Sequence, residues 1–114
     1  MPRDDSAYLL DMLLAARDAL SFTEGMSYDD FVSDRRTQLS VLKSVEIVGE
    51  AAAHVSEDTR RTQPGIPWAE IVGMRNRLVH VYFDIDLQLV WATVRDDLPA
   101  LTTLLEPLVP PETE

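Results

Sequence analysis

The stretch from Val41 to Val55, VLKSVEIVGEAAAHV, decides the fold of this chain. Small or branched apolar residues recur in it at alternating steps of four and three, at Val41, Val45, Val48, Ala52 and Val55. Residues three and four apart lie on one face of a helix, so this spacing is typical of the seam of a helix packed in a bundle. The stretch therefore predicts a long helix that buries one face against other helices.

Helical periodicity continues on both sides of this stretch. Start signals and loop residues divide the chain into expected helices at residues 5–24, 27–55, 57–62, 67–81 and 87–105, the second broken near residues 33–34. Gly25 should end the first helix in the left-handed conformation, and Pro99 should kink the last one. We expect an all-α, four- to five-helix up-and-down bundle over residues 1–107, followed by a proline-rich acidic tail over residues 108–114.

The first expected helix has a wide apolar face. Asp4, Asp5 or Ser6 offers its N-cap. Its apolar stripe consists of Leu9, Met12, Leu13, Ala16 and Leu20, widened by Tyr8, Leu10, Leu14 and Ala15. A stripe of this width indicates burial on two sides, within the domain and against a second copy of the chain. The sequence therefore predicts a homodimer.

Composition excludes several classes of protein. The chain has 114 residues and no cysteine, which excludes disulfides and thiolate metal sites. No apolar run is long enough for a membrane span, and the acidic N-terminus does not resemble a signal peptide, so we expect a cytoplasmic protein. The formal charge is −10, but residues 35–77 carry seven basic against five acidic side chains. One basic surface on an acidic molecule is therefore compatible with a nucleic-acid partner.

The chemically richest segment is residues 74–83, MRNRLVHVYF. It combines Arg75, Asn76, His80 and Tyr82, and histidine with arginine is a minimal set for acid/base chemistry at a phosphodiester. On a continuous helix Asn76 would stack on His80, whereas Arg75 and His80 would lie about 140° apart. A shared site would then need a second helix or a dimer axis. The alternative is a packed histidine beside a solvated arginine face.

These residues resemble the R-x4-H-x-Y signature of the HepT-like branch of the HEPN superfamily, whose general motif is R-x4–6-H. Further similar segments are Glu46-x2-Gly49-Glu50-Ala51, Pro67-Trp68, Tyr82-Phe83 and Asp97-Leu98-Pro99-x-Leu101. The resemblance covers roughly residues 5–105. In this chain Val81 stands where the family often has aspartate.

The resemblance implies a metal-independent ribonuclease toxin that uses no cofactor and has its site at a homodimer interface. His80 would be the general acid/base, Arg75 would stabilise charge on the phosphoryl oxygens, and Asn76 would orient His80 or contact the phosphate. The usual partner is a minimal nucleotidyltransferase antitoxin, which silences the toxin by transferring AMP to the motif tyrosine, here Tyr82. The alternative is a non-catalytic HEPN scaffold that binds such a nucleotidyltransferase.

Other polar residues extend these expectations. Glu50 is expected to face Arg75 and hold it in place. Arg60, Arg61 and Arg77 are candidates for contacts with RNA. Glu46, Glu50 and His54 recur every four residues, but a single E-x-x-x-H without a partner motif predicts no metal site.

Overall fold

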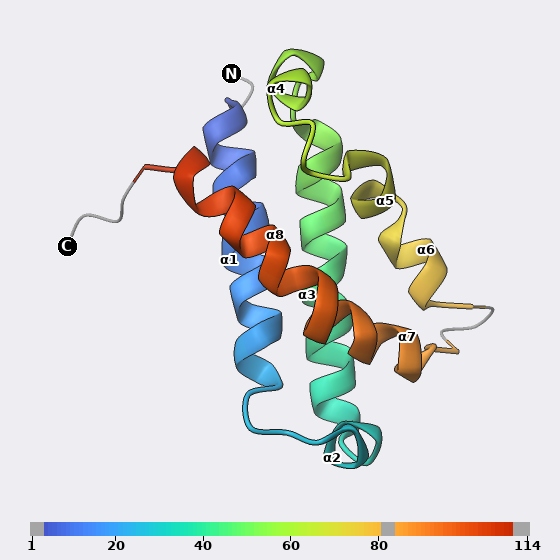
Figure 1. Cartoon of the computed structure of the whole chain (residues 1–114). Helices are drawn as coiled ribbons and strands as arrows, with labels where there is room; N and C mark the ends of the chain where they lie inside the picture. The colour runs from blue at the N-terminus through green and yellow to red at the C-terminus, as the bar shows by residue number, and fades with distance from the viewer. Residues whose placement is uncertain (1–3, 81–83, 111–114) are drawn as a thin grey trace.

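The structure is a computed structural model that describes residues 4–80 and 84–110. Two long helices, α1 (Asp5–Phe22) and α3 (Arg35–His54), lie side by side and antiparallel, with the short α2 (Tyr28–Val32) in the connection between them (Figure 1). After α3 the chain forms α4 (Glu57–Thr62), α5 (Trp68–Val72) and α6 (Met74–Leu78). The α5–α6 segment flanks α3 on the side away from α1.

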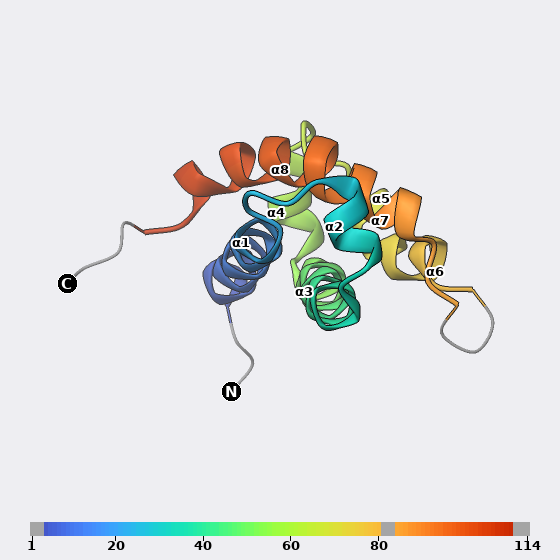
Figure 2. The ribbon, with the colours of Figure 1, turned by 90° about the horizontal axis from the view of Figure 1, so that it is seen from below.

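The last part of the chain crosses the α1–α3 pair. It consists of α7 (Leu87–Ala92), a π-helical turn (Thr93–Asp97), α8 (Leu98–Leu105) and a 3₁₀ turn (Glu106–Leu108). Figure 2 shows this rod lying across one face of α1 and α3. The described residues form no strand, and the expected all-α fold class is confirmed. Within them, no helix is both long and apolar enough to cross a membrane.

Helix starts follow the capping residues that the sequence offers. Asp4 is the N-cap of α1 and accepts a hydrogen bond from the Ala7 amide, and Ser27 forms a reciprocal capping box with Asp30. Asp86 likewise caps α7. Helix α1 ends at Phe22, two residues before the expected end, and Gly25 adopts a φ of +76° in the turn that follows. The expected break near residues 33–34 is present as well.

A single core fills the space between these layers. All five residues of the α3 seam are buried, and so are Leu9, Met12, Leu13 and Ala16 of α1. The crossing rod contributes Val90, Val94, Leu98, Leu101 and Leu105. Leu14 of α1 and Ile47 of α3 remain exposed on the described chain.

The expected continuous helix over residues 67–81 is wrong. It is interrupted at Gly73 and ends at Leu78, and Val79 forms an antiparallel bridge with Ile85. The Asp86 amide donates to the Leu78 carbonyl and the His80 amide to the Asp84 carbonyl, both at 2.8 Å. These bonds to a later segment, with β-branched residues at 79 and 85, favour extended backbone over another helical turn. Residues 81–83, including Tyr82, lie outside the described chain.

The last expected helix is present, and its irregularity lies just before Pro99. Proline has no amide hydrogen to donate to a preceding carbonyl, and the π turn over residues 93–97 accommodates this. Arg95 in this turn stacks 4.3 Å above the Trp91 ring and donates to the Met26 carbonyl at 2.7 Å. Leu108 and Val109 also pack against the core. The boundary between domain and tail at residue 107 stays a prediction.

Candidate functional site

A close helix contact positions the candidate site. A Cβ atom at Gly49 of α3 would lie 3.0 Å from the Ile71 carbonyl oxygen and 3.6 Å from that of Val72. Glycine therefore lets α5 approach the backbone of α3. Because α6 directly follows α5, this contact also sets the position of Arg75 and Asn76 relative to α3.

A groove of about 530 Å³ lies along this contact. Its polar lining consists of Lys43, Glu46, Glu50 and His54 from α3 and Arg75 and Asn76 from α6. Arg75 Nε donates to Glu46 Oε1 at 3.0 Å, and Glu46 Oε2 lies 3.9 Å from Lys43 Nζ. The Arg75 side chain is 39% exposed, so its guanidinium is held at the rim of the groove and is accessible from solvent.

Glu46 pairs with Arg75, and the expected contact of Glu50 with Arg75 stays a prediction. The two carboxylates stand one helical turn apart on the same stripe of α3, and both line the groove. The sequence did not predict the contact with Glu46, because it depends on how far α6 is shifted along α3. Among residues 4–80 and 84–110, no three His, Cys, Asp or Glu side chains gather closely enough to hold a metal ion.

His80 lies apart from this groove. It follows the end of α6, its side chain is 56% exposed, and its Nε2 stands 3.7 Å from Asp86 Oδ2. The residues that line the groove do not include His80. The expected stacking of Asn76 on His80 is wrong, since His80 is not helical. One chain thus brings Arg75 and Asn76 to one hollow and leaves His80 outside it.

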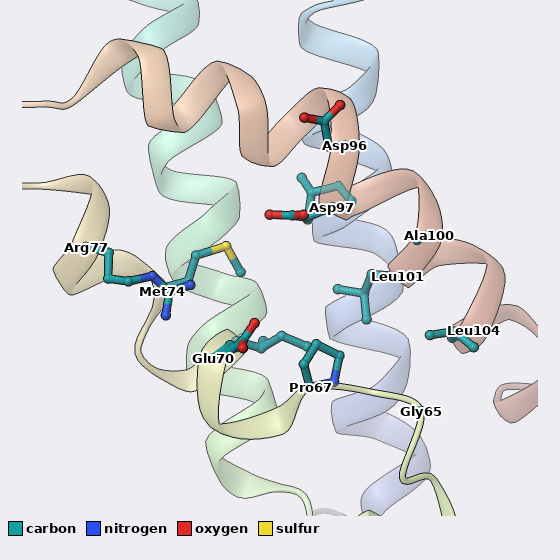
Figure 3. Close-up of a pocket in the computed structure, with 12 residues that line it drawn as sticks. Gly65, Pro67, Glu70, Met74, Arg77, Asp96, Asp97, Ala100, Leu101 and Leu104 are labelled. Carbon is teal, nitrogen blue, oxygen red and sulfur yellow. The ribbon is translucent and has the colours of Figure 1, made fainter.

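The other candidate arginines do not join this groove. Arg77 lines a second hollow of about 210 Å³ together with Glu70, Asp96 and Asp97, and the Asp97 carboxylate points toward the side where Arg77 and Glu70 lie (Figure 3). Arg60 donates to the Ala52 and Val55 carbonyls at 2.8 and 3.1 Å and so caps the end of α3. Arg61 pairs with Glu57 and Asp58 on the surface of α4. The sequence did not lead us to expect that Arg60 caps α3, although a basic residue shortly after a helix end often indicates such a cap.

Comparison with known proteins identifies the family. The family model described as ribonuclease HepT-like matches residues 12–108, most of the chain. The chain belongs to the ribonuclease HepT-like family. The expected resemblance to HepT-like proteins is thereby confirmed.

Several curated relatives match this HepT-like chain over nearly its full length. A protein of Thermococcus cleftensis named "Probable ribonuclease HepT" is 38% identical over 108 residues, which cover 95% of this chain and 98% of the relative. A protein of Methanocaldococcus jannaschii named as a candidate RNase is 38% identical over 104 residues, covering 91% and 95% of the two chains. A candidate RNase of Caldanaerobacter subterraneus is 33% identical over 94 residues, covering 82% and 84%. No solved structure gives a significant match.

Proposed function

We propose that this chain is a metal-independent endoribonuclease toxin whose active site is completed by a second copy of the chain. The observation that carries the proposal is the separation of its two candidate catalytic groups. Arg75 is fixed in a groove by Glu46, whereas His80 lies on an exposed segment outside that groove. Membership of the HepT-like family and relatives named as ribonucleases support the reaction class.

The chemistry requires one proton acceptor, one proton donor and a fixed positive charge. In the proposed reaction, neutral His80 takes the proton of a ribose 2′-hydroxyl, whose oxygen attacks the neighbouring phosphorus. The bond from phosphorus to the 5′-oxygen breaks, that leaving oxygen takes a proton from water, and the proton held by His80 returns to solvent. Arg75 stabilises the charge on the phosphoryl oxygens, and Asn76 contacts the phosphate. The product carries a 2′,3′-cyclic phosphate, and no metal-bound water takes part.

Silencing by a minimal nucleotidyltransferase antitoxin is the second part of the proposal. Tyr82 follows His80 by two residues, so an AMP group on its hydroxyl would add negative charge beside the catalytic histidine and repel RNA. When this chain is co-expressed with its nucleotidyltransferase, its intact mass should show added AMP units. These units should be absent in Tyr82→Phe. An unmodified mass in an inactive pair would indicate inhibition by occlusion instead.

Overexpression in a bacterial host tests the enzyme directly. We expect the wild-type protein to arrest growth and fragment cellular RNA, and Arg75→Ala and His80→Ala each to relieve the arrest. Arg36→Ala is the matched control, since Arg36 is an exposed arginine near the start of α3, away from the groove. Circular dichroism should show that all variants remain folded.

A non-catalytic scaffold for a nucleotidyltransferase is the second candidate. The observation that favours it is the net charge of −10, which weakens attraction to RNA. Harmless wild-type protein that leaves RNA intact but binds a nucleotidyltransferase would establish the scaffold and reject the enzyme.

A further inference from the structure

A second aromatic and polar cluster adjoins the Arg75 groove. Tyr8 of α1 and His54, the last residue of α3, stack with ring centroids 5.0 Å apart and an interplanar angle of 17°. They line a hollow of about 290 Å³ between α1 and α3, together with Asp11, Ile47, Glu50 and Ala51. This hollow shares Ile47, Glu50 and His54 with the groove that contains Arg75. The two hollows therefore adjoin each other at this stripe of α3, one on the side of α1 and the other on the side of α5 and α6.

The combined surface has two chemically different ends. Lys43 and Arg75 provide positive charge at one end, and the Tyr8–His54 stack provides aromatic surface at the other. Between Lys43 and His54 the helix rises about 16 Å. A nucleotide has the same polarity, since an anionic phosphate is joined through a sugar to a flat base.

Glu50 stands between these ends and lines both hollows. An ionised carboxylate only accepts hydrogen bonds, and it accepts two parallel ones especially well. Guanine presents two adjacent donors, N1–H and the N2 amino group, on its Watson–Crick edge. Uracil presents a single N–H between two carbonyl oxygens, which the carboxylate would repel.

We propose that the Tyr8–His54 stack and Glu50 form a nucleobase subsite that takes guanine in preference to uracil beside the scissile phosphate. The stack provides the platform on which the base lies, and such stacking accepts every base. Glu50 supplies the selection. This inference rests on the proposed ribonuclease function for its biological meaning, but the subsite is built from a single chain and its binding is measured separately.

Histidine NMR of the intact protein tests binding. The chain contains only two histidines, so the imidazole C–H signals of His54 and His80 are assigned with one His54→Phe variant. Addition of GMP should shift the His54 signal strongly by ring-current effects, and UMP should shift it much less. In Glu50→Gln the difference between the two nucleotides should shrink. A His54 signal that ignores GMP, or that responds equally to GMP and UMP, would overturn the proposal.

Cleavage mapping tests the same subsite in the reaction. Wild-type protein should cut next to guanine, and His54→Ala should raise KM about tenfold with little change in kcat, as expected for the loss of one base stack. His54→Phe retains a flat ring and should restore KM, and thermal unfolding of His54→Ala separates a loss of base stacking from a loss of stability. Cleavage without base preference, unchanged in His54→Ala, rejects the subsite but leaves the ribonuclease intact. A GMP response without any cleavage rejects the ribonuclease instead.

Discussion

The ion pair between Arg75 and Glu46 should contribute little to stability and more to the proposed chemistry. Their side chains are 39% and 32% exposed, and solvent screens such a pair so that it contributes only about 0–1 kcal/mol to folding. In the proposed reaction its larger effect is geometric, because the carboxylate fixes the direction of the guanidinium that would meet the phosphoryl oxygens. A small change in the direction of the guanidinium lowers the rate of a reaction that depends on alignment.

Replacing Glu46 should therefore separate kcat from stability. We expect Glu46→Ala to lower kcat for RNA cleavage roughly ten- to a hundredfold, because Arg75 is no longer aligned. KM should stay level or fall, since the groove loses a negative charge, and Tm should change little. Cleavage kinetics on a defined RNA measure kcat and KM, and thermal unfolding measures Tm.

Glu57→Ala serves as the matched control, because Glu57 also pairs with an arginine but lies on exposed α4, away from the groove. If Glu46→Ala cuts RNA as fast as Glu57→Ala, Glu46 does not position the catalytic arginine.

At the scale of elements, local signals predicted where helices start and failed to predict where one of them ends. Asp4, Ser27 and Asp86 cap their own helices through bonds to residues three positions away, which the sequence displays directly. The end of α6 depends on the bridge between Val79 and Ile85 and on two backbone hydrogen bonds to Asp84 and Asp86. Such longer-range pairing cannot be read from helical periodicity, and the histidine of the motif was misplaced for that reason.

The contact between α3 and α5 should be sensitive to one methyl group. We expect Gly49→Ala to destabilise the protein by about 1–3 kcal/mol, because its Cβ would press on the rigid backbone carbonyl of Ile71. Displacement of α5 and α6 should also reduce cleavage. Urea unfolding measures the first effect and RNA cleavage the second.

Gly65→Ala is the control for this prediction, since a Cβ there meets nothing within 4 Å. Equal stability of the two alanine variants would mean that α3 and α5 do not depend on this close approach.

The junction of α1 with α4 should weaken in acid. The Asp5 carboxylate accepts hydrogen bonds from the Ser56 amide and from the hydroxyls of Ser56 and Thr59, and these bonds hold its pKa below the ordinary value. A lowered folded-state pKa gives stability that is present above the unfolded pKa of about 4 and lost as pH falls through the folded value. The free energies of unfolding of wild type and Asp5→Ala should therefore differ most near neutral pH and converge in acid.

Urea titrations at several pH values measure this difference. Asp58→Ala, a surface carboxylate paired only with Arg61 among the contacts of the described chain, should show no comparable convergence. A gap for Asp5→Ala that is constant with pH would mean that the carboxylate charge does not matter at this junction.

At the scale of the whole molecule, the question is how Arg75 and His80 come together. The sequence predicted that one helix would hold them on different faces. The structure separates them for another reason, since His80 has left the helix altogether. Both separations are consistent with the proposed site shared between two chains, an arrangement commonly achieved with two-fold symmetry.

Mixing two inactive variants tests this sharing. Arg75→Ala and His80→Ala chains should each be inactive alone. When they are unfolded and refolded together, half of the dimers are mixed, and each mixed dimer carries one intact Arg75–His80 combination. We expect recovery of roughly a quarter of wild-type cleavage, by the statistics of random two-fold assembly. No recovery in a mixture shown by mass spectrometry to contain mixed dimers would place both groups of each site in one chain.

The position of His80 after the end of α6 also bears on how the motif varies in length. Inside a helix, each inserted residue turns everything beyond it by about 100° and would carry a catalytic side chain to another face. Between Leu78 and His80 the chain has left the helix, so a residue added there turns no helical face and leaves Arg75 in place. The spacing between Arg75 and His80 can therefore change without moving Arg75 to another face of α6. Evolution can adjust the reach of the histidine without disturbing the helix that holds the arginine.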